Sequence, residues 1–255
     1  MTHVISSFDI SVYDKDIAST LFFLNIDVTS WTLDKDDSNI PTIVDFEIIG
    51  KLNIYDTYGM KKQKLSIVYY SKKLNIIIIS FAGTTKLSEW LDDFDARQTS
   101  PIAITTDDIY KVHLQHYNMY NSLRESFIDL LKTYVNDDTT IVVTGYSLGA
   151  SISNICMFDI TMNTLCNKRV LYNFASCRTG NNNFVKILDN EHIYRIGNTS
   201  DLVPSLPPPV FGKYIYTHTS NGIYFTINTE SISSNHCDAY NKYFENFLVV
   251  KTKTF

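Results

Sequence analysis

Residues 141–149 read Ile-Val-Val-Thr-Gly-Tyr-Ser-Leu-Gly, with Ser147 between a β-branched run and a helix-like segment. The run predicts a buried strand, and the residues after it predict a helix. A tight turn from strand to helix leaves no room for side chains at its flanks, so glycine stands at both. Such a turn lifts the serine above the edge of a sheet in a strained backbone conformation. The stretch therefore predicts a nucleophilic serine on an α/β scaffold.

The rest of the chain alternates between strand-like and helix-like patterns. A continuous apolar run with four isoleucines, 74–81, predicts a strand buried on both faces. Strands that alternate with helices favour an α/β fold with a mostly parallel central sheet and helices on both faces. The predicted strands are 43–54 and 64–70 (a hairpin), 74–81, 141–143, 170–174 and 192–196, and the predicted helices are 11–28, 112–135, 151–163 and 239–247.

The composition limits the class of protein. The chain has 255 residues, of which 44% are hydrophobic and 19% charged, so it can bury a sizeable core. We expect one domain over residues 1–255. The 22 basic and 27 acidic residues give a net charge of −5, which offers no electrostatic case for a nucleic-acid partner.

The sequence shows neither a membrane span nor a metal-binding pattern. No apolar run approaches the ~20 residues that cross a bilayer, so no transmembrane segment is expected. The first thirty residues lack the basic start and apolar stretch of a secretory signal, so we expect a cytoplasmic protein, with secretion left open if a leader is removed. The four cysteines lack C-x-x-C spacing, so no zinc site is expected. A nucleophilic serine with a base and an acid calls for no metal and no organic cofactor.

A serine nucleophile needs a base and an acid, which in this topology follow it in the chain. Asp201 comes just after the predicted strand 192–196, at the edge where sites of open α/β sheets lie. His236 lies in a polar loop before the predicted helix 239–247. The residues alone leave both choices open, because other acids and histidines follow the serine. These alternatives are Asp189, Asp238, His192 and His218.

Beyond these local patterns, residues 64 to 247 resemble the fungal-type triacylglycerol lipases, also called class 3 lipases. The resemblance implies an α/β-hydrolase fold and hydrolysis of carboxylic esters without a cofactor. Its motifs are Phe81-Ala82-Gly83-Thr84, Val112-His113 with Tyr120-Asn121-Ser122, Val143-Thr144-Gly145-Tyr146-Ser147-Leu148-Gly149, Phe174 to Asn181, Tyr194-Arg195 with Asn198-Thr199-Ser200-Asp201-Leu202-Val203-Pro204, and His236 with Tyr240.

The resemblance also implies roles for individual residues. Ser147 is expected to be the nucleophile, His236 the general base and Asp201 the carboxylate that fixes the imidazole tautomer. The amide of Leu148 is expected to be one oxyanion-hole donor, and Thr84 the second. His218 matches a family histidine that is not catalytic.

Residues 85–95 predict a short amphipathic helix where the family carries its lid. Its apolar face consists of Leu87, Trp90, Leu91 and Phe94 at helical spacing. A lid of this kind would expose that face at a lipid interface, where burial of apolar area stabilises binding. The alternative is an ordinary helix packed on the core.

Several positions depart from the family pattern, among them Gln115-His116 and Ser176-Cys177. Tyr146 replaces the usual histidine before the nucleophile, and Ala82 replaces an arginine near the oxyanion loop. None of these changes removes a catalytic group, but they leave the substrate preference open. We expect a lipase that acts on acylglycerols. The alternatives are a phospholipase A1 or short-chain esterase on the same fold, and an inactive lipid- or partner-binding module.

Overall fold

The structure is a computed structural model that describes residues 2–5, 8–55, 62–88, 95–163 and 166–251. Its main strands are β3 (Glu47–Tyr55), β4 (Lys62–Ser71), β5 (Ile76–Phe81), β8 (Thr140–Tyr146), β9 (Lys168–Phe174), β10 (His192–Asn198) and β13 (Gly222–Phe225). They form a seven-stranded sheet in the order β13-β10-β9-β8-β5-β4-β3. Neighbours from β5 to β13 run parallel, whereas β4 pairs antiparallel with both β5 and β3. The predicted hairpin and the mostly parallel sheet are confirmed.

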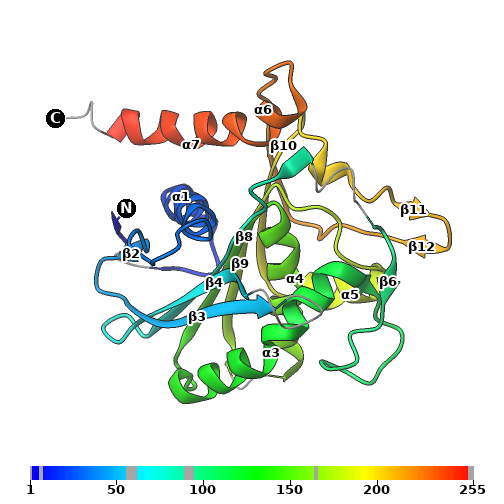
Figure 1. Ribbon diagram of the computed structural model, residues 1–255, viewed down its shortest axis with the longest axis horizontal. Coiled ribbons are helices and arrows are strands. Elements are labelled where there is room, and N and C mark those ends of the chain that lie inside the picture. Colours follow the sequence, from blue (N-terminus) through cyan, green and yellow to red (C-terminus); the bar gives the residue numbers. More distant parts are fainter. Residues whose placement is uncertain (1, 6–7, 56–61, 89–94, 164–165, 252–255) are drawn as a thin grey trace.

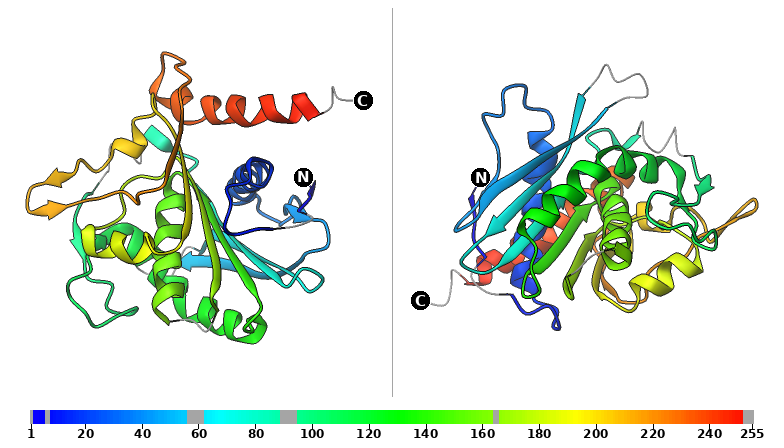
Figure 2. Two further views of the ribbon diagram at one scale, coloured as in Figure 1. Left: turned by 180° about the vertical axis from the view of Figure 1, so that it is seen from behind. Right: turned by 90° about the horizontal axis from the view of Figure 1, so that it is seen from below.

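Helices cover both faces of this sheet (Figure 1). On one face lie α3 (Leu114–Tyr134), α4 (Leu148–Asn163) and α5 (Asn182–Leu188). On the other face lie α1 (Lys15–Trp31) and α7 (Asp238–Lys251). The view from below in Figure 2 shows these two layers on either side of the strands. The prediction of helices on both faces is therefore also confirmed.

The central strands send alternate side chains into two separate cores. Every residue of β5 is buried, with Ile77 and Ile79 in one core and Ile76 and Ile78 in the other. Successive side chains of a strand point to opposite faces, so a strand covered on both sides reads as a continuous apolar run. This explains the pattern of the segment 74–81.

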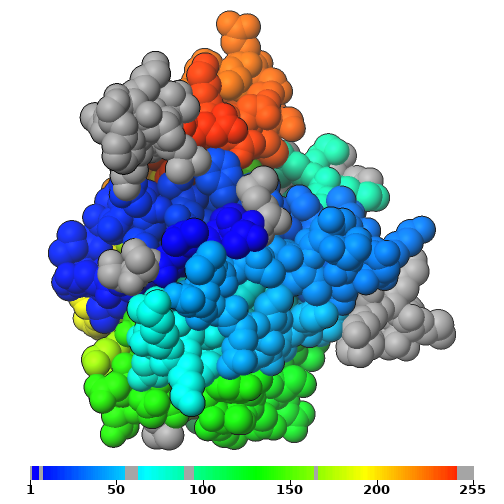
Figure 3. All heavy atoms as spheres, turned by 90° about the vertical axis from the view of Figure 1, so that its left-hand side faces the viewer, coloured from blue at the N-terminus to red at the C-terminus, as the bar shows by residue number. Residues whose placement is uncertain are grey.

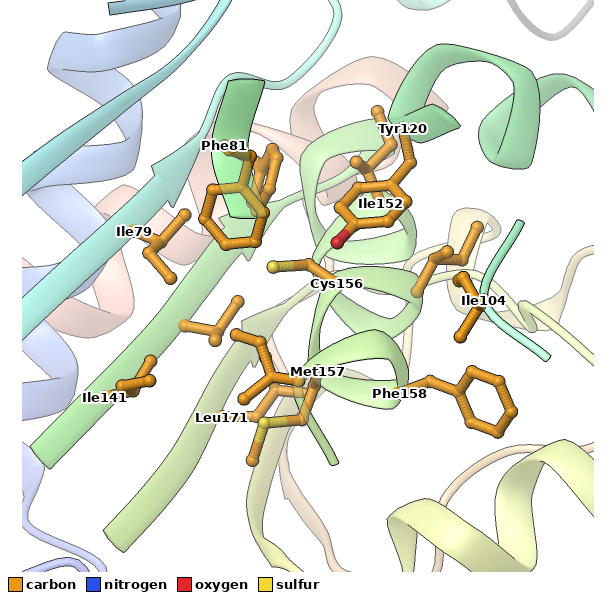
Figure 4. Close-up of a cluster of buried hydrophobic side chains, with 14 of the residues drawn as sticks. Ile79, Phe81, Ile104, Tyr120, Ile141, Ile152, Cys156, Met157, Phe158 and Leu171 are labelled. Atoms are coloured by element: carbon orange, nitrogen blue, oxygen red, sulfur yellow. The ribbon is translucent and has the colours of Figure 1, made fainter. Parts of the chain in front are cut away.

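The larger core lies under α4. Figure 4 shows Cys156 and Met157 of this helix facing Ile79 of β5 and Leu171 of β9. Most of α4 is buried, including the carboxylate of Asp159. That carboxylate accepts hydrogen bonds from Arg124 (Nε, 2.7 Å; Nη2, 2.9 Å) and from the hydroxyl of Tyr120 (2.7 Å), which join α3 to α4. A charge buried in such a core requires partners of this kind.

Several short elements surround the sheet. They are β1 (Thr2–His3), β2 (Thr42–Ile43), β6 (Gln98–Thr99), β7 (Val112–His113), β11 (Val210–Phe211), β12 (Tyr214–Ile215), the 3-10 helix η1 (Val203–Ser205) and α6 (Ile232–His236). Figure 3 shows the side of the molecule on which α1, β3 and β4 lie. β11 and β12 form a ribbon at the opposite side (Figure 1).

The structure corrects some predicted boundaries. Residues 112–113 are not the start of α3, because Val112 pairs with Thr99 in a two-stranded ladder. α4 begins at Leu148, directly after the serine turn. The sequence interpretation missed α5, a helix of seven residues, and β13, a strand of four residues at the sheet edge. Both are too short to show a clear hydrophobic period.

Candidate active site

Ser147 lies in the turn between β8 and α4, with a left-handed backbone conformation (φ 58°). The turn is tight enough to require glycine on both sides. A Cβ at Gly145 would lie 2.3 Å from the carbonyl oxygen of Gly149, and a Cβ at Gly149 would lie 2.4 Å from that of Phe81. No side chain fits at such distances. The turn therefore places the serine side chain beyond the end of β8, as its sequence pattern predicts.

Three side chains predicted to act together lie within hydrogen-bonding distance of one another. The Oγ atom of Ser147 is 2.8 Å from Nε2 of His236, and Nδ1 of His236 is 2.8 Å from Oδ2 of Asp201. Ser147 and His236 are each 1% exposed, and Asp201 is 4% exposed. A hydroxyl, an imidazole and a carboxylate in this order can move a proton from the serine to the histidine.

Asp201 is held by groups on the backbone and on α7. Its Oδ1 atom accepts a hydrogen bond from the backbone N–H of Val203 (3.0 Å), and Oδ2 accepts one from the hydroxyl of Tyr240 (3.1 Å). The same hydroxyl accepts the backbone N–H of Asn198 at the end of β10 (2.8 Å). Burial raises the pKa of Tyr240 well above its usual value, and the nearby Asp201 adds to the effect, so the phenol keeps its proton as a donor.

The side chain of Asn198 joins the acid loop to the histidine loop. Its Nδ2 donates to the carbonyl oxygens of Asn235 (3.0 Å) and Ile227 (2.8 Å), and its Oδ1 accepts from the backbone N–H of Ile227 (3.0 Å). Asn198 is 2% exposed. Although Asn198-Thr199-Ser200 has the form of a glycosylation sequon, this amide is already bonded inside the fold. The sequence interpretation missed this role, which no local pattern signals.

Tyr146 contacts both the ring and the backbone of His236. Its hydroxyl donates to the carbonyl oxygen of His236. Its ring stacks on the imidazole with centroids 5.1 Å apart and planes 24° apart. Burial raises the pKa of Tyr146 well above its usual value, so this phenol also stays protonated. The residue that departs from the family pattern thus supports the histidine next to the serine.

The two expected oxyanion donors lie on adjoining segments. Leu148 is the first residue of α4, where backbone N–H groups have no acceptor within the helix. Thr84 follows β5, and the N–H of the preceding Gly83 donates to Oγ1 of Thr29 on α1 (2.8 Å). The hydroxyl of Thr84 accepts the N–H of Lys86 (3.2 Å). Gly149 lets these segments approach, because α4 packs directly on the carbonyl of Phe81. Their role as an oxyanion hole stays a prediction.

A groove of about 980 Å³ opens beside this loop. Thr84, Leu148 and Met119 line it, together with charged residues such as Asp37 and Lys64. The groove gives solvent access to the predicted oxyanion donors. Oγ of Ser147 itself is covered, since the residue is 1% exposed.

The alternative acids and histidines lie elsewhere. Asp189 accepts the N–H (2.8 Å) and the hydroxyl (2.6 Å) of Ser220, and His192 begins β10 with an exposed side chain. Nε2 of His218 lies 2.6 Å from the carbonyl oxygen of Pro204. Burial, together with the nearby Arg195, lowers the pKa of His218 to about 3, so this histidine is neutral. Asp238 is in the first turn of α7.

The predicted lid cannot be compared with the structure over most of its length. Trp90, Leu91 and Phe94 lie outside the described residues, and the described Leu87 is half-buried. Residues 85–95 therefore remain a predicted lid. Within the ranges that the structure describes, no group of three or more potential metal ligands occurs. None of the helices in those ranges is long and apolar enough to cross a bilayer.

Comparison with known proteins identifies the family. The family described as "Lipase (class 3)" matches residues 78–211, more than half of the chain. The chain belongs to the class 3 lipases. The matched region contains Thr84, Ser147 and Asp201, whereas His236 lies beyond it. The resemblance noted in the sequence motifs is confirmed.

Two curated relatives have similar sequences. Phospholipase A1-IIbeta from Arabidopsis thaliana is 28% identical over 186 residues, which cover 60% of this chain and 43% of the relative. The secreted mono- and diacylglycerol lipase MDL3 from Malassezia globosa is 29% identical over 182 residues, covering 65% of this chain and 56% of the relative. The class 3 lipase chain thus spans about half the length of these relatives.

Solved class 3 lipase structures share the fold. The mono- and diacylglycerol lipase from Aspergillus oryzae has a TM-score of 0.62 at 21% identity, and the match covers 86% of this chain and 82% of the Aspergillus chain. The triacylglyceride lipase from Rhizomucor miehei has a TM-score of 0.63 at 20% identity, and the match covers 86% of this chain and 83% of the Rhizomucor chain. The predicted α/β-hydrolase fold is confirmed.

Proposed function

We propose that this class 3 lipase hydrolyses lipid esters, with acylglycerols as the main substrates. The observation that carries the proposal is the chain of short contacts from Oγ of Ser147 through His236 to Asp201. Burial of all three residues supports it, because a water-excluded site strengthens the hydrogen bonds and charges inside it.

The reaction begins with proton transfer from the serine. With its proton on Nδ1, which donates to Asp201, the imidazole of His236 accepts the hydroxyl proton of Ser147 at Nε2. Oγ attacks the ester carbonyl, and the resulting oxyanion receives hydrogen bonds from the backbone N–H groups of Leu148 and Thr84. His236 then protonates the departing alcohol, which leaves an acyl group on Ser147.

The second half of the reaction releases the acid. A water molecule enters the position of the alcohol, and His236 accepts its proton as the water attacks the acyl-enzyme. The fatty acid leaves and Ser147 regains its proton. Every proton in this cycle moves through Nε2 of His236, while Asp201 stays ionised and stabilises the imidazolium.

The identity of the lipid is a separate question. The Malassezia relative is named for mono- and diacylglycerol hydrolysis, which agrees with acylglycerol substrates. The Arabidopsis relative is named a phospholipase A1, which favours phospholipids as the second candidate. A short-chain esterase remains the third candidate. Initial rates on dioleoylglycerol, triolein, phosphatidylcholine and p-nitrophenyl butyrate distinguish the three, because each candidate predicts a different preferred substrate.

Ser147→Ala tests the proposal itself. We expect it to reduce hydrolysis of every substrate to background while the thermal unfolding temperature stays close to that of the parent. Ser151→Ala is a matched control on the first turns of α4, where the hydroxyl of Ser151 contacts Nδ1 of His116 (2.6 Å) rather than His236. A folded parent chain without esterase activity would instead support the lipid- or partner-binding module.

The cytoplasmic location predicted from the sequence stays a prediction. The Malassezia relative is named a secreted protein. We propose that contact with lipid is transient and at the surface. Fractionation of cells that express the full chain, with assays of medium and cytosol, distinguishes the two locations.

A further inference from the structure

A ribbon next to the acid loop presents large apolar side chains to solvent. β11 and β12 form a two-stranded antiparallel hairpin that projects from the body of the molecule in the views of Figures 1 and 2. Val210 is 66% exposed, Phe211 47% and Ile215 52%. Single exposed apolar residues are common, but these three lie within six residues of one projecting hairpin.

Both faces of this ribbon are apolar or aromatic. Val210 pairs with Ile215, and Phe211 pairs with Tyr214. Because neighbouring residues of a strand point to opposite faces, the first pair lies on one face and the second pair on the other. A β-hairpin that is exposed to solvent usually has one polar face. Neither face of this ribbon is polar, so immersion in an apolar medium stabilises both.

The base of the ribbon is fixed to the body. Tyr216 follows β12 and is 2% exposed, and its hydroxyl donates to the carbonyl oxygen of Ala96 (2.9 Å). The backbone N–H of Tyr216 donates to the carbonyl of Pro209 (2.9 Å), and Nε2 of Gln98 donates to the carbonyl of Ile215 (2.7 Å). The apolar part therefore projects from an anchored base.

The segment that links the ribbon to Asp201 is also anchored. Nε2 of His218 contacts the carbonyl of Pro204 (2.6 Å), and Arg178 donates to the carbonyl of Pro207 (2.7 Å). Pro204 and Pro207 lie on the short segment of chain that connects Asp201 to the start of β11. A surface that binds the ribbon would thus hold the active site at a fixed height above it.

We propose that residues 210–215, the apolar ribbon, bind a lipid–water interface and orient the active site toward it. Phenylalanine and tyrosine suit the boundary between acyl chains and headgroups. Lys213 lies in the connecting turn, with its ammonium 5.5 Å from the ring of Tyr214, where it can meet lipid phosphates. The inference rests in part on the proposed function, because a lipid ester substrate lies in such an interface.

A lipid surface accounts for the ribbon better than a protein partner does. A specific protein–protein interface buries roughly 1,200–2,000 Å² in total, contributed by about 20–30 residues on each side. The apolar ribbon supplies six residues, four of them apolar or aromatic, which is too few for a stable dimer of this chain. Insertion into lipid has no such minimum area, since affinity rises with each apolar group that is buried.

Vesicle flotation of the full chain tests the inference. In a Ser147→Ala background, we expect the chain to bind phosphatidylcholine vesicles and Phe211→Asp to weaken binding about tenfold or more. Val44→Asp is the matched control, because Val44 is 43% exposed and follows β2 at the opposite side of the molecule. We expect that control to bind like its parent.

A second readout reports directly on insertion. In Phe211→Trp, the added indole is expected to shift its emission to the blue when vesicles are added, beyond any change in the parent. No vesicle binding by the parent, equal binding by Phe211→Asp, or an unshifted indole would each overturn the inference. Hydrolysis of soluble p-nitrophenyl butyrate by chains with an intact Ser147 separates the two proposals. We expect Phe211→Asp to keep this activity on the soluble ester. If the proposed function is wrong, the parent chain does not hydrolyse the soluble ester, and vesicle binding is unaffected.

Discussion

Replacing Asp201 with asparagine removes one charge and preserves the shape of the side chain, so it tests how the carboxylate acts on His236. Oδ1 of Asp201 accepts the backbone N–H of Val203 at 3.0 Å. Oδ2 accepts the Tyr240 hydroxyl at 3.1 Å and lies 2.8 Å from Nδ1 of His236. The N–H of Val203 is fixed by the backbone, so the amide oxygen of the asparagine must occupy the Oδ1 position.

That orientation forces the wrong tautomer on the histidine. The NH₂ group of the asparagine takes the Oδ2 position and donates to Nδ1 of His236, which must then be unprotonated. The ring proton moves to Nε2, which faces Ser147 and can no longer accept its proton. Loss of the correct tautomer in a serine triad costs about 10⁴-fold in kcat, or roughly 5 kcal/mol of transition-state stabilisation.

The variant is assayed for kcat/KM on p-nitrophenyl butyrate and for its unfolding free energy in urea. We expect kcat/KM to fall by about 10³–10⁴-fold, with a loss of roughly 1–3 kcal/mol in stability as the Tyr240 hydroxyl loses its charged acceptor. Asp189→Asn is the control. The exposed Asp189 bonds to Ser220 alone among the described side chains, so we expect this variant to leave kcat/KM unchanged. A folded Asp201→Asn chain that keeps more than about a tenth of the parent activity would refute the tautomer argument.

Three further outcomes follow from the same contacts. Tyr146→Phe removes the hydrogen bond to the His236 carbonyl but keeps the ring stack, so kcat/KM should fall by no more than about tenfold; a loss as large as that of Ser147→Ala would contradict it. Gly149→Ala places a Cβ 2.4 Å from the carbonyl of Phe81 and should lower the unfolding free energy in urea by about 1–3 kcal/mol; an unchanged value would show that the turn is looser. Burial lowers the folded-state pKa of His113 to about 4, below its usual value, so the unfolded chain binds the proton more tightly and stability is lost as pH falls from about 6.5 to 4. His113 should contribute about 1.4 kcal/mol per pH unit to this slope, and His113→Gln should reduce the slope by about that amount; an equal slope would assign the effect to other groups.

The elements that the sequence predicted are those with strong local signals. β5 contains four consecutive isoleucines and β8 contains the run Ile141-Val142-Val143, and the turn at Ser147 is marked by glycines that the backbone geometry requires. Asp201 lies three residues after the end of β10, so chain order alone predicts its position at the sheet edge. His236 had no comparable local signal, and its choice over His218 rested on the family resemblance.

The contacts that support the site depend on the tertiary structure and left no local signal. Asn198 bonds to Asn235 across 37 residues, and Tyr146 bonds to His236 across 90. Such pairs are set by how α6 and α7 dock on the sheet rather than by periodicity. β12 likewise covers only Tyr214–Ile215, because the chain turns inward at the buried Tyr216.

The most direct test of the central claim is the mass of the folded chain after reaction with a fluorophosphonate, followed by peptide mapping of the adduct. The account predicts one adduct per chain, on Ser147, formed far more slowly in Asp201→Asn. A folded chain that stays unmodified, or an adduct on a different residue, would contradict it.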